Sequence, residues 1–238
     1  MVERMRQDTT DRAGALPPAP VSGRQKSATP GTDAKRERIL QAAEWLFHEQ
    51  GYADTTMDQI VGKLGVTKPY VYYYFHNKQE LFELLAWEPS VACFTVLDGP
   101  DDGRPAHEKV ARALRDIIRL TIDYHPSSFF AFREPQAFRP EFAAELRRLA
   151  NHFYTKLCAL LEQARADGTL EFGDTRVTAQ AACSISGYMY TWYRPEGRLS
   201  PEEMVRELTQ LAWRVIGLHT TAPGRRPTNL HLIPKEPP

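Results

Sequence analysis

The stretch Thr67-Lys-Pro-Tyr-Val-Tyr-Tyr-Tyr-Phe-His-Asn-Lys78 places four tyrosines and a phenylalanine in six consecutive residues, with a lysine near each end. Thr67 is a favourable N-cap residue. Pro69 falls in the first turn that would follow, where its missing N–H costs no helical hydrogen bond. The stretch therefore predicts a short helix, and it raises the question of what its exposed rings contact.

The rings of this helix divide by direction. At about 100° per residue, Val71 and Phe75 share the side that can face a core, whereas Tyr73 points the opposite way. A helix in the major groove of DNA presents such an outward side chain to base edges and its flanking hydroxyl groups to phosphates. The alternative is that the rings fill a core or pack on a partner. The helix is too short to bury every face, which favours DNA contact.

The preceding residues predict two further helices. Thr55 to Asp58 has the pattern of a capping residue followed by an acid, and the short helix that it opens should stop at Gly65. Before it, a longer helix should open at residue 32 or 33 and close at Gly51, because apolar residues recur at helical spacing: Ile39, Ala42, Ala43, Leu46 and Phe47. Helix, short helix, glycine turn and short helix form the layout of a helix-turn-helix.

Nine residues of this motif are candidate DNA contacts. Tyr73 is placed for base edges, and the neighbouring tyrosine hydroxyls are placed for phosphate oxygens. Lys78 and the free N–H groups at the helix starts add positive potential where a phosphate backbone would pass. The complete set is Thr56, Thr67, Lys68, Pro69, Tyr70, Tyr72, Tyr73, Tyr74 and Lys78.

A set of residues at fixed spacing runs through these helices: Ile39-Leu40-x-Ala42-Ala43-x-x-Leu46-Phe47, Gly51-Tyr52-x-x-Thr55-Thr56, Ile60, Gly65-Val66-Thr67 and Val71-Tyr72-x-Tyr74-Phe75-x-x-Lys78-x-x-Leu81. With these residues, roughly residues 33 to 85 resemble the DNA-binding domain of the tetracycline-repressor (TetR) family. The resemblance implies an all-helical homodimer, whose N-terminal domain binds DNA and whose larger C-terminal domain binds an inducer and dimerises. Two positions depart from the family pattern: Val61 replaces an alanine, and Pro69-Tyr70 replaces a small Gly-Thr pair toward DNA.

The rest of the chain also predicts helices. Asn77 to Glu80 repeats the cap-and-acid pattern at the start of a helix that should kink or end at Pro89. Apolar spacing and turn residues indicate the remaining helices: one to about His125, a short aromatic one over 127–132, and longer ones over 140–167, 174–193 and 200–219.

No stretch indicates a strand, so the predicted fold class is all-α: an N-terminal helix-turn-helix three-helix domain joined to a larger helical ligand-binding and dimerisation domain. We expect the DNA-binding domain over 32–78 and the effector-binding and dimerisation domain over 79–220. Residues 1–31 are rich in Pro, Ala, Ser and Gly, and residues 221–238 are rich in Pro. Neither range shows a helical or strand period, which predicts two disordered tails.

The last two helices are candidates for dimerisation. Small residues from Ala179 to Gly187 would let another helix approach closely, and Leu211 belongs to an apolar repeat in the final helix. The same pattern also fits helices that complete the protomer core. The family resemblance favours a homodimer that binds a palindromic operator, with Ala182 and Leu211 as interface positions.

The effector site is predicted from composition rather than from a motif. Aromatic side chains can line an apolar pocket, and a few polar groups can fix one end of its ligand. Each aromatic could equally be plain core, and Arg133 could form a solvated pair with Glu134. The linker over 193–203 resembles a family branch associated with fatty-acid or steroid catabolism, so acyl-CoA is a candidate effector. The candidate ligand contacts are Trp87, Phe94, His125, Phe129, Phe130, Arg133 and Phe153.

Composition narrows the remaining classes of protein. The chain of 238 residues is 42% hydrophobic and 25% charged, which is enough to fold without disulfides or metals. Its three cysteines form no Cys-x-x-Cys pair, so we expect a reducing cytoplasm and no metal or cofactor. No apolar run reaches the length of a membrane span. Thirty basic residues balance thirty acidic ones, so DNA binding must depend on where charges lie.

Catalytic motifs are absent from the sequence. It has no glycine-rich phosphate loop, no Gly-x-Ser-x-Gly and no His-Glu-x-x-His, so we expect no enzyme. We predict a ligand-responsive DNA-binding regulator, in the first place a repressor released from its operator by a small apolar or acyl-thioester ligand. The alternative is a helical dimeric adaptor, or a regulator without small-molecule control. An adaptor would lack the basic and hydroxyl side chains that Lys68, Lys78 and the tyrosines supply.

Overall fold

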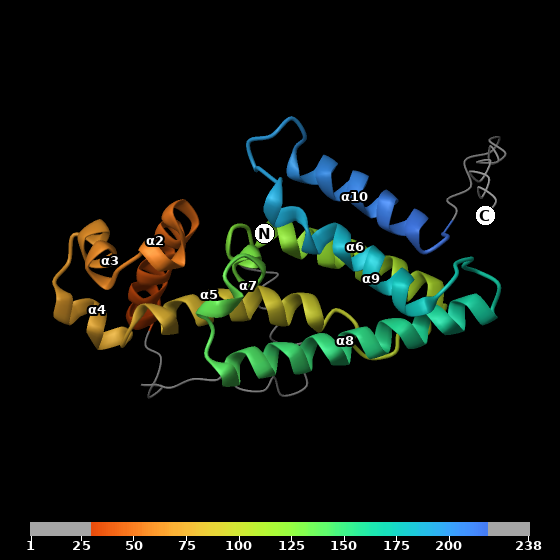
Figure 1. Ribbon diagram of the computed structural model, residues 1–238, viewed down its shortest axis with the longest axis horizontal. Helices are drawn as coiled ribbons and strands as arrows, with labels where there is room; N and C mark the ends of the chain where they lie inside the picture. The colour runs from red at the N-terminus through yellow and green to blue at the C-terminus, as the bar shows by residue number, and fades with distance from the viewer. Residues whose placement is uncertain (1–29, 219–238) are drawn as a thin grey trace, which may run out of the picture.

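The computed structural model describes residues 30–218, and every regular element within this range is a helix. A small group of helices, α2 to α4, lies at one end of the molecule, and α5 connects it to a larger helical bundle (Figure 1). The predicted all-α class, with a helix-turn-helix and a larger helical domain, is confirmed. The predicted tails fall outside the described residues, except that α2 already begins at Pro30.

The N-terminal group consists of α2 (Pro30–Asp54), α3 (Met57–Leu64) and α4 (Lys68–Tyr74). Gly51 has a φ of 84°, which interrupts the regular helix where the sequence predicted its end, and one more turn carries the chain to Asp54. The three helices enclose an apolar core, whose fully buried members are Ile39, Ala43, Ile60, Val71 and Phe75.

The connecting helix α5 (Lys78–Phe94) continues through Pro89, so the expectation that the helix ends there is wrong. Pro89 removes one backbone donor. Both sides of it are nevertheless buried: Trp87 is 8% exposed and Val91 is 5% exposed. Packing on two sides therefore outweighs the lost hydrogen bond. Within residues 30–218, no helix is both long and apolar enough to cross a membrane.

The larger bundle is built on α6 (Ala106–Asp123), α8 (Pro140–Ala166), α9 (Thr175–Gly187) and α10 (Pro201–Val215). Four short elements join these helices: η1 (Ser127–Phe129), α7 (Phe130–Arg133), η2 (Pro135–Ala137) and η3 (Met189–Thr191). The bundle has its own apolar core, which includes Leu114, Ile118, Phe153, Leu157 and Leu161.

The segment formed by α7 and η2 joins the two groups of helices. Phe130 and Ala137 are buried in the N-terminal core although they follow α6 in sequence. The Gln79 side chain donates a hydrogen bond to the Ala137 carbonyl, at 2.9 Å. Arg139 donates to both carboxylate oxygens of Glu83, whose side chain is 3% exposed. The DNA-binding core is therefore completed by residues of the larger domain.

Helices α9 and α10 each bury one face and expose another. Ala182 is 2% exposed and belongs to the protomer core, so its choice as an interface position is wrong. At about 100° per residue, Val177 and the C-cap residue Tyr188 fall together on another side of α9, where they are 67% and 62% exposed. Leu211 on α10 is 47% exposed, in agreement with a surface position.

Candidate nucleic-acid interface

Helix α3 begins at a reciprocal cap. The Thr56 hydroxyl accepts from the Gln59 backbone N–H, and the Gln59 side chain accepts from the Thr56 N–H. The sequence had placed this cap one residue earlier, on Thr55 and Asp58, which is wrong. Thr55 is fully buried, and its hydroxyl donates to the Gly51 carbonyl at 2.7 Å. The second threonine therefore fixes the start of α3, while the first closes the end of α2.

The turn between α3 and α4 depends on Gly65, which has a φ of 64° and a ψ of 32°. This left-handed conformation costs a residue without a side chain little, and it ends α3 sharply. Thr67 precedes α4 in extended conformation, as predicted for an N-cap residue. Its side chain makes no capping hydrogen bond, however, and the residue is exposed.

Helix α4 separates Val71 and Phe75 from Tyr72 and Tyr73 as the sequence predicted, whereas the candidate DNA contact Tyr70 packs partly against the core. Val71 and Phe75 are fully buried, whereas Tyr73 is 62% exposed and Tyr72 is 45% exposed. Tyr70 and Tyr74 are half-buried against the core, and the ring centroids of Tyr73 and Tyr74 lie 4.9 Å apart. The outward face therefore presents Tyr72, Tyr73, Lys68 and Pro69 to solvent. Contact of these side chains with DNA stays a prediction.

The two candidate lysines have different surroundings. Lys68 is exposed and forms an ion pair with Asp58 at 2.9 Å, which raises its pKa. The Lys78 ammonium instead donates to the carbonyls of Tyr52, Ala53 and Thr55, at 2.7, 3.1 and 2.8 Å. Lys78 therefore fastens the start of α5 to the end of α2. The sequence analysis did not predict this role. One signal for it was present: the last turn of α2 has no basic residue of its own, so its carbonyls need a donor from elsewhere.

The turn that follows α4 is fixed by side chains. The Asn77 side-chain oxygen Oδ1 accepts from the Glu80 backbone N–H, so the predicted cap of the next helix is confirmed. Glu80 in turn accepts from the His76 N–H at 2.8 Å. These contacts fix the turn between α4 and the N-terminus of α5. That N-terminus carries free backbone N–H groups of the kind that bind phosphate.

Comparison with known proteins assigns both halves of the chain. The family model "Bacterial regulatory proteins, tetR family" matches residues 39–85, which contain α3, α4 and parts of α2 and α5. The model "Tetracyclin repressor-like, C-terminal domain" matches residues 103–216. The chain belongs to the TetR family. TetR-family regulators are dimeric transcription factors that bind operator DNA.

Individual relatives agree with this assignment. The transcriptional activator FasR of Mycolicibacterium smegmatis is 25% identical over 214 residues, which cover 87% of this chain and 93% of FasR. PfmR of Thermus thermophilus superposes with a TM-score of 0.64 at 24% identity, covering 74% of this chain and 97% of PfmR. AibR, in complex with isovaleryl coenzyme A and operator DNA, superposes with a TM-score of 0.61 at 20% identity, covering 78% of this chain and 100% of AibR. The two structural matches support the TetR fold.

The structure distributes the seven candidate effector contacts of this TetR-family chain over several places. Phe129 and Phe153 are buried in the core of the larger bundle, and Phe94 packs against it. Trp87 lies in a smaller cluster, with its ring 5.5 Å from that of Phe142. Phe130 belongs to the DNA-binding core and not to the core of the larger bundle, where an effector contact was expected. His125 and Arg133 line a cleft between the two domains.

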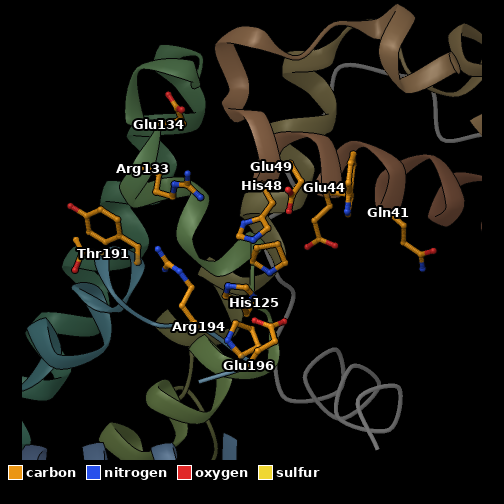
Figure 2. Close-up of a pocket in the computed structure, with 14 residues that line it drawn as sticks. Gln41, Glu44, His48, Glu49, His125, Arg133, Glu134, Thr191, Arg194 and Glu196 are labelled. Atoms are coloured by element: carbon orange, nitrogen blue, oxygen red, sulfur yellow. The ribbon is translucent and has the colours of Figure 1, made fainter. Parts of the chain in front are cut away.

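This interdomain cleft was not predicted from sequence. Its volume is about 960 Å³, and α2 forms one wall. The other wall consists of His125 and Pro126 after α6, the end of α7, and η3 with the residues that follow it. Figure 2 shows Arg133 and Arg194 extending into the space opposite His48 and Glu49. The residues come from four separate parts of the sequence, so no local motif could have indicated the cleft.

Proposed function

We propose that this TetR-family protein is a dimeric regulator that acts in the cytoplasm, inserts α4 into the major groove of a palindromic operator, and responds to a small molecule. The exposure of Tyr72 and Tyr73 carries the proposal. These aromatic side chains face solvent on a helix whose other side, formed by Val71 and Phe75, is fully buried. Large exposed rings on a short, well-anchored helix indicate a binding surface.

The chemistry of this face suits DNA. Tyr73 lies at the middle of the outward side, where base edges and thymine methyl groups would meet it. Lys68 is exposed one turn before Tyr72 and supplies a positive charge, which Asp58 pairs at 2.9 Å in the absence of DNA. The Thr67 hydroxyl makes no capping bond and can bind phosphate. Pro69-Tyr70 stands where the TetR-family pattern usually has a small Gly-Thr pair, so we expect this chain to recognise an operator sequence of its own.

Two exposed apolar surfaces support dimerisation through α9 and α10. The outward side of α9 carries Val177, Ala181, Ser184 and Tyr188, and α10 exposes Leu211 and Val215. Pairing these helices with those of a second protomer would bury both surfaces in a two-fold interface. The two recognition helices would then bind half-sites about 34 to 36 Å apart, or a multiple of that spacing.

The core of the larger bundle is the proposed effector site. Phe94 and Phe153 lie with ring centroids 6.1 Å apart, and Phe129 belongs to the same core. Burial raises the pKa of the Cys93 and Cys183 thiols to about 12, so both are neutral at physiological pH. A neutral apolar core suits an apolar or acyl ligand. AibR, which shares this fold, has been solved with isovaleryl coenzyme A, and an acyl-thioester is our proposed ligand class.

Helix α5 connects the proposed effector site to the DNA-binding domain. Leu81, Phe82 and Ala86, in its first half, belong to the N-terminal core. Phe94, at its end, packs on the core of the larger bundle. A ligand that separates the bundle helices would tilt α5 and change the spacing of the two recognition helices. Such a ligand releases DNA only if it binds the tilted state more tightly.

Whether a regulator represses or activates depends on where its operator lies in the promoter, and the fold does not decide it. We propose repression, although FasR is named an activator. A regulator without small-molecule control is the second candidate, because the aromatic residues also fit a plain core. Fluorescence anisotropy with the DNA that flanks the gene, with and without acyl-CoA of several lengths, tests both. Saturable binding to one palindromic fragment supports the regulator. Operator affinity that no acyl-CoA changes would favour the second candidate.

A further inference from the structure

The interdomain cleft offers a binding site distinct from the apolar core. Its two walls belong to different domains: His48 lies on α2, whereas Arg133 ends α7 and Arg194 follows η3 (Figure 2). A molecule bound here would contact both domains at once. The cleft volume of about 960 Å³ lies within the usual range for small-molecule sites, roughly 300 to 1,000 Å³.

Two guanidinium groups extend into this cleft without a carboxylate partner. Neither Arg133 nor Arg194 forms an ion pair within the described part of the chain, although four glutamates line the same cleft. Arg194 donates one hydrogen bond to the Tyr193 carbonyl, at 2.8 Å. Glu134 accepts a hydrogen bond from Gln136. Most of the donor atoms of both arginines are therefore free to bind a ligand.

His48, on the α2 wall, meets His125 of the larger domain. The rings of His48 and His125 meet edge to face, with centroids 5.2 Å apart and planes at 80°. His48 Nδ1 is buried and has no hydrogen-bond partner among residues 30–218. A buried polar atom without a partner costs free energy, which a ligand could recover by bonding to it.

Two arginines and four glutamates line the cleft, so anion binding depends on the positions of Arg133 and Arg194 near His48 and not on the net charge of the lining. Burial lowers the pKa of His48, and among the charged groups Arg133 lowers it most, followed by Glu49, which raises it. Arg194 lowers the same pKa, and Glu196 raises it. The arginine beside His48 thus has the largest single effect of any charged group on the imidazole. Arginine also binds phosphate and carboxylate groups in bidentate geometry.

We propose that the cleft binds the phosphate or carboxylate group of a small anionic molecule through Arg133, Arg194 and His48. The bound anion holds α2 against the larger domain and so limits the movement of the DNA-binding domain. Its binding is independent of operator recognition, whereas its effect on operator affinity rests on the proposed function. The site accepts an anion from the cleft opening and needs no opening of the apolar core.

Calorimetric titration of the full chain with pyrophosphate and with citrate tests this proposal. We expect saturable binding of at least one probe, and a weakening of at least about tenfold in Arg133→Gln and in Arg194→Gln. Arg147→Gln is the matched control, because Arg147 is an exposed arginine on α8 that does not line the cleft. It should bind as the unmodified protein does. Pyrophosphate binding alone identifies a phosphate site, and citrate binding alone identifies a carboxylate site.

Histidine titration by NMR supplies a second readout. A bound anion beside His48 favours the charged imidazole, so its pKa should rise with the probe, and Arg133→Gln should raise it without any probe. Binding that is equal in all three arginine variants would show nonspecific attraction and overturn the proposal. So would the absence of binding at about 10 mM of both probes. Neither of these two outcomes bears on operator recognition, which anisotropy measures separately.

Discussion

The rings of Phe130 and Phe82 stack with centroids 5.1 Å apart and planes 20° apart, although one follows α6 and the other lies on α5. Phe130 also meets Phe47 of α2 edge to face at 6.1 Å. Because Phe130 is 2% exposed, the larger domain supplies part of the DNA-binding core. A change in the position of α7 must therefore disturb the packing that supports α4.

Phe130→Ala should lower the free energy of unfolding by about 3 to 5 kcal/mol, because it removes a buried ring from a core shared by two domains. Urea unfolding followed by circular dichroism measures the change. Phe132→Ala is the control, since Phe132 is on the same helix but 48% exposed, and it should cost less than about 1 kcal/mol. Equal losses in the two variants would contradict the shared core.

Tyr73→Ala should weaken operator binding by about 1 to 3 kcal/mol and random DNA binding much less, because Tyr73 is placed toward base edges. Mobility-shift titrations with both DNAs give the two affinities. Asn151→Ala, an exposed change on α8 outside the proposed interface, serves as the control for folding. If Tyr73→Ala weakened specific and random binding alike, Tyr73 would be a phosphate contact.

Lys68→Ala and Lys78→Ala should separate a phosphate contact from a structural contact. Loss of the Lys68 charge should weaken binding to both operator and random DNA. It should also reduce the slope of log affinity against log salt concentration by about one unit per half-site, with no change in thermal stability. Loss of Lys78 leaves three carbonyls without their donor and should cost about 1 to 3 kcal/mol of folding free energy. A Lys78 variant of unchanged stability and reduced salt dependence would assign Lys78 to phosphate instead.

Leu211→Glu combined with Ala181→Glu should give folded monomers, because both residues are exposed on the proposed interface. Sedimentation velocity measures the mass and circular dichroism the helix content. Ala182→Glu should instead unfold the protein, since Ala182 is 2% exposed and a glutamate there would bury a charge. A Leu211 and Ala181 double variant that stays dimeric would place the interface elsewhere.

Folding stability should fall as the pH drops from about 6.5 toward 4. Burial, followed by His48, lowers the pKa of His125 from 6.5 to about 4. Between these values the unfolded chain binds more protons than the folded protein, so acid favours unfolding. Glu196 opposes this effect, and Arg194 and Arg133 reinforce it. Thermal melts from pH 7.5 to 4.5 should show a smaller decline in His125→Gln. An identical decline would assign the effect to other groups.

The sequence by itself determined the helices and the face of α4 that is buried. Helical spacing of apolar residues and local capping signals depend on neighbours within about four positions, and such signals survive without tertiary information. Asn77 and Gly65 act as the sequence predicted, and the burial of Val71 and Phe75 follows from angle alone. The helix-turn-helix and its family could therefore be identified from residues 33 to 85.

Only the tertiary structure decided which distant residues share a core or a cleft. Phe130 belongs to the DNA-binding core, Ala182 to the protomer core and Lys78 to the end of α2, and none of these contacts is local in sequence. Helical spacing predicts that a residue faces inward, but it does not predict which helix that residue packs against. The approach of His48 to His125 is of the same kind, because 77 positions separate them and only the packing of α2 against the larger domain brings their rings together.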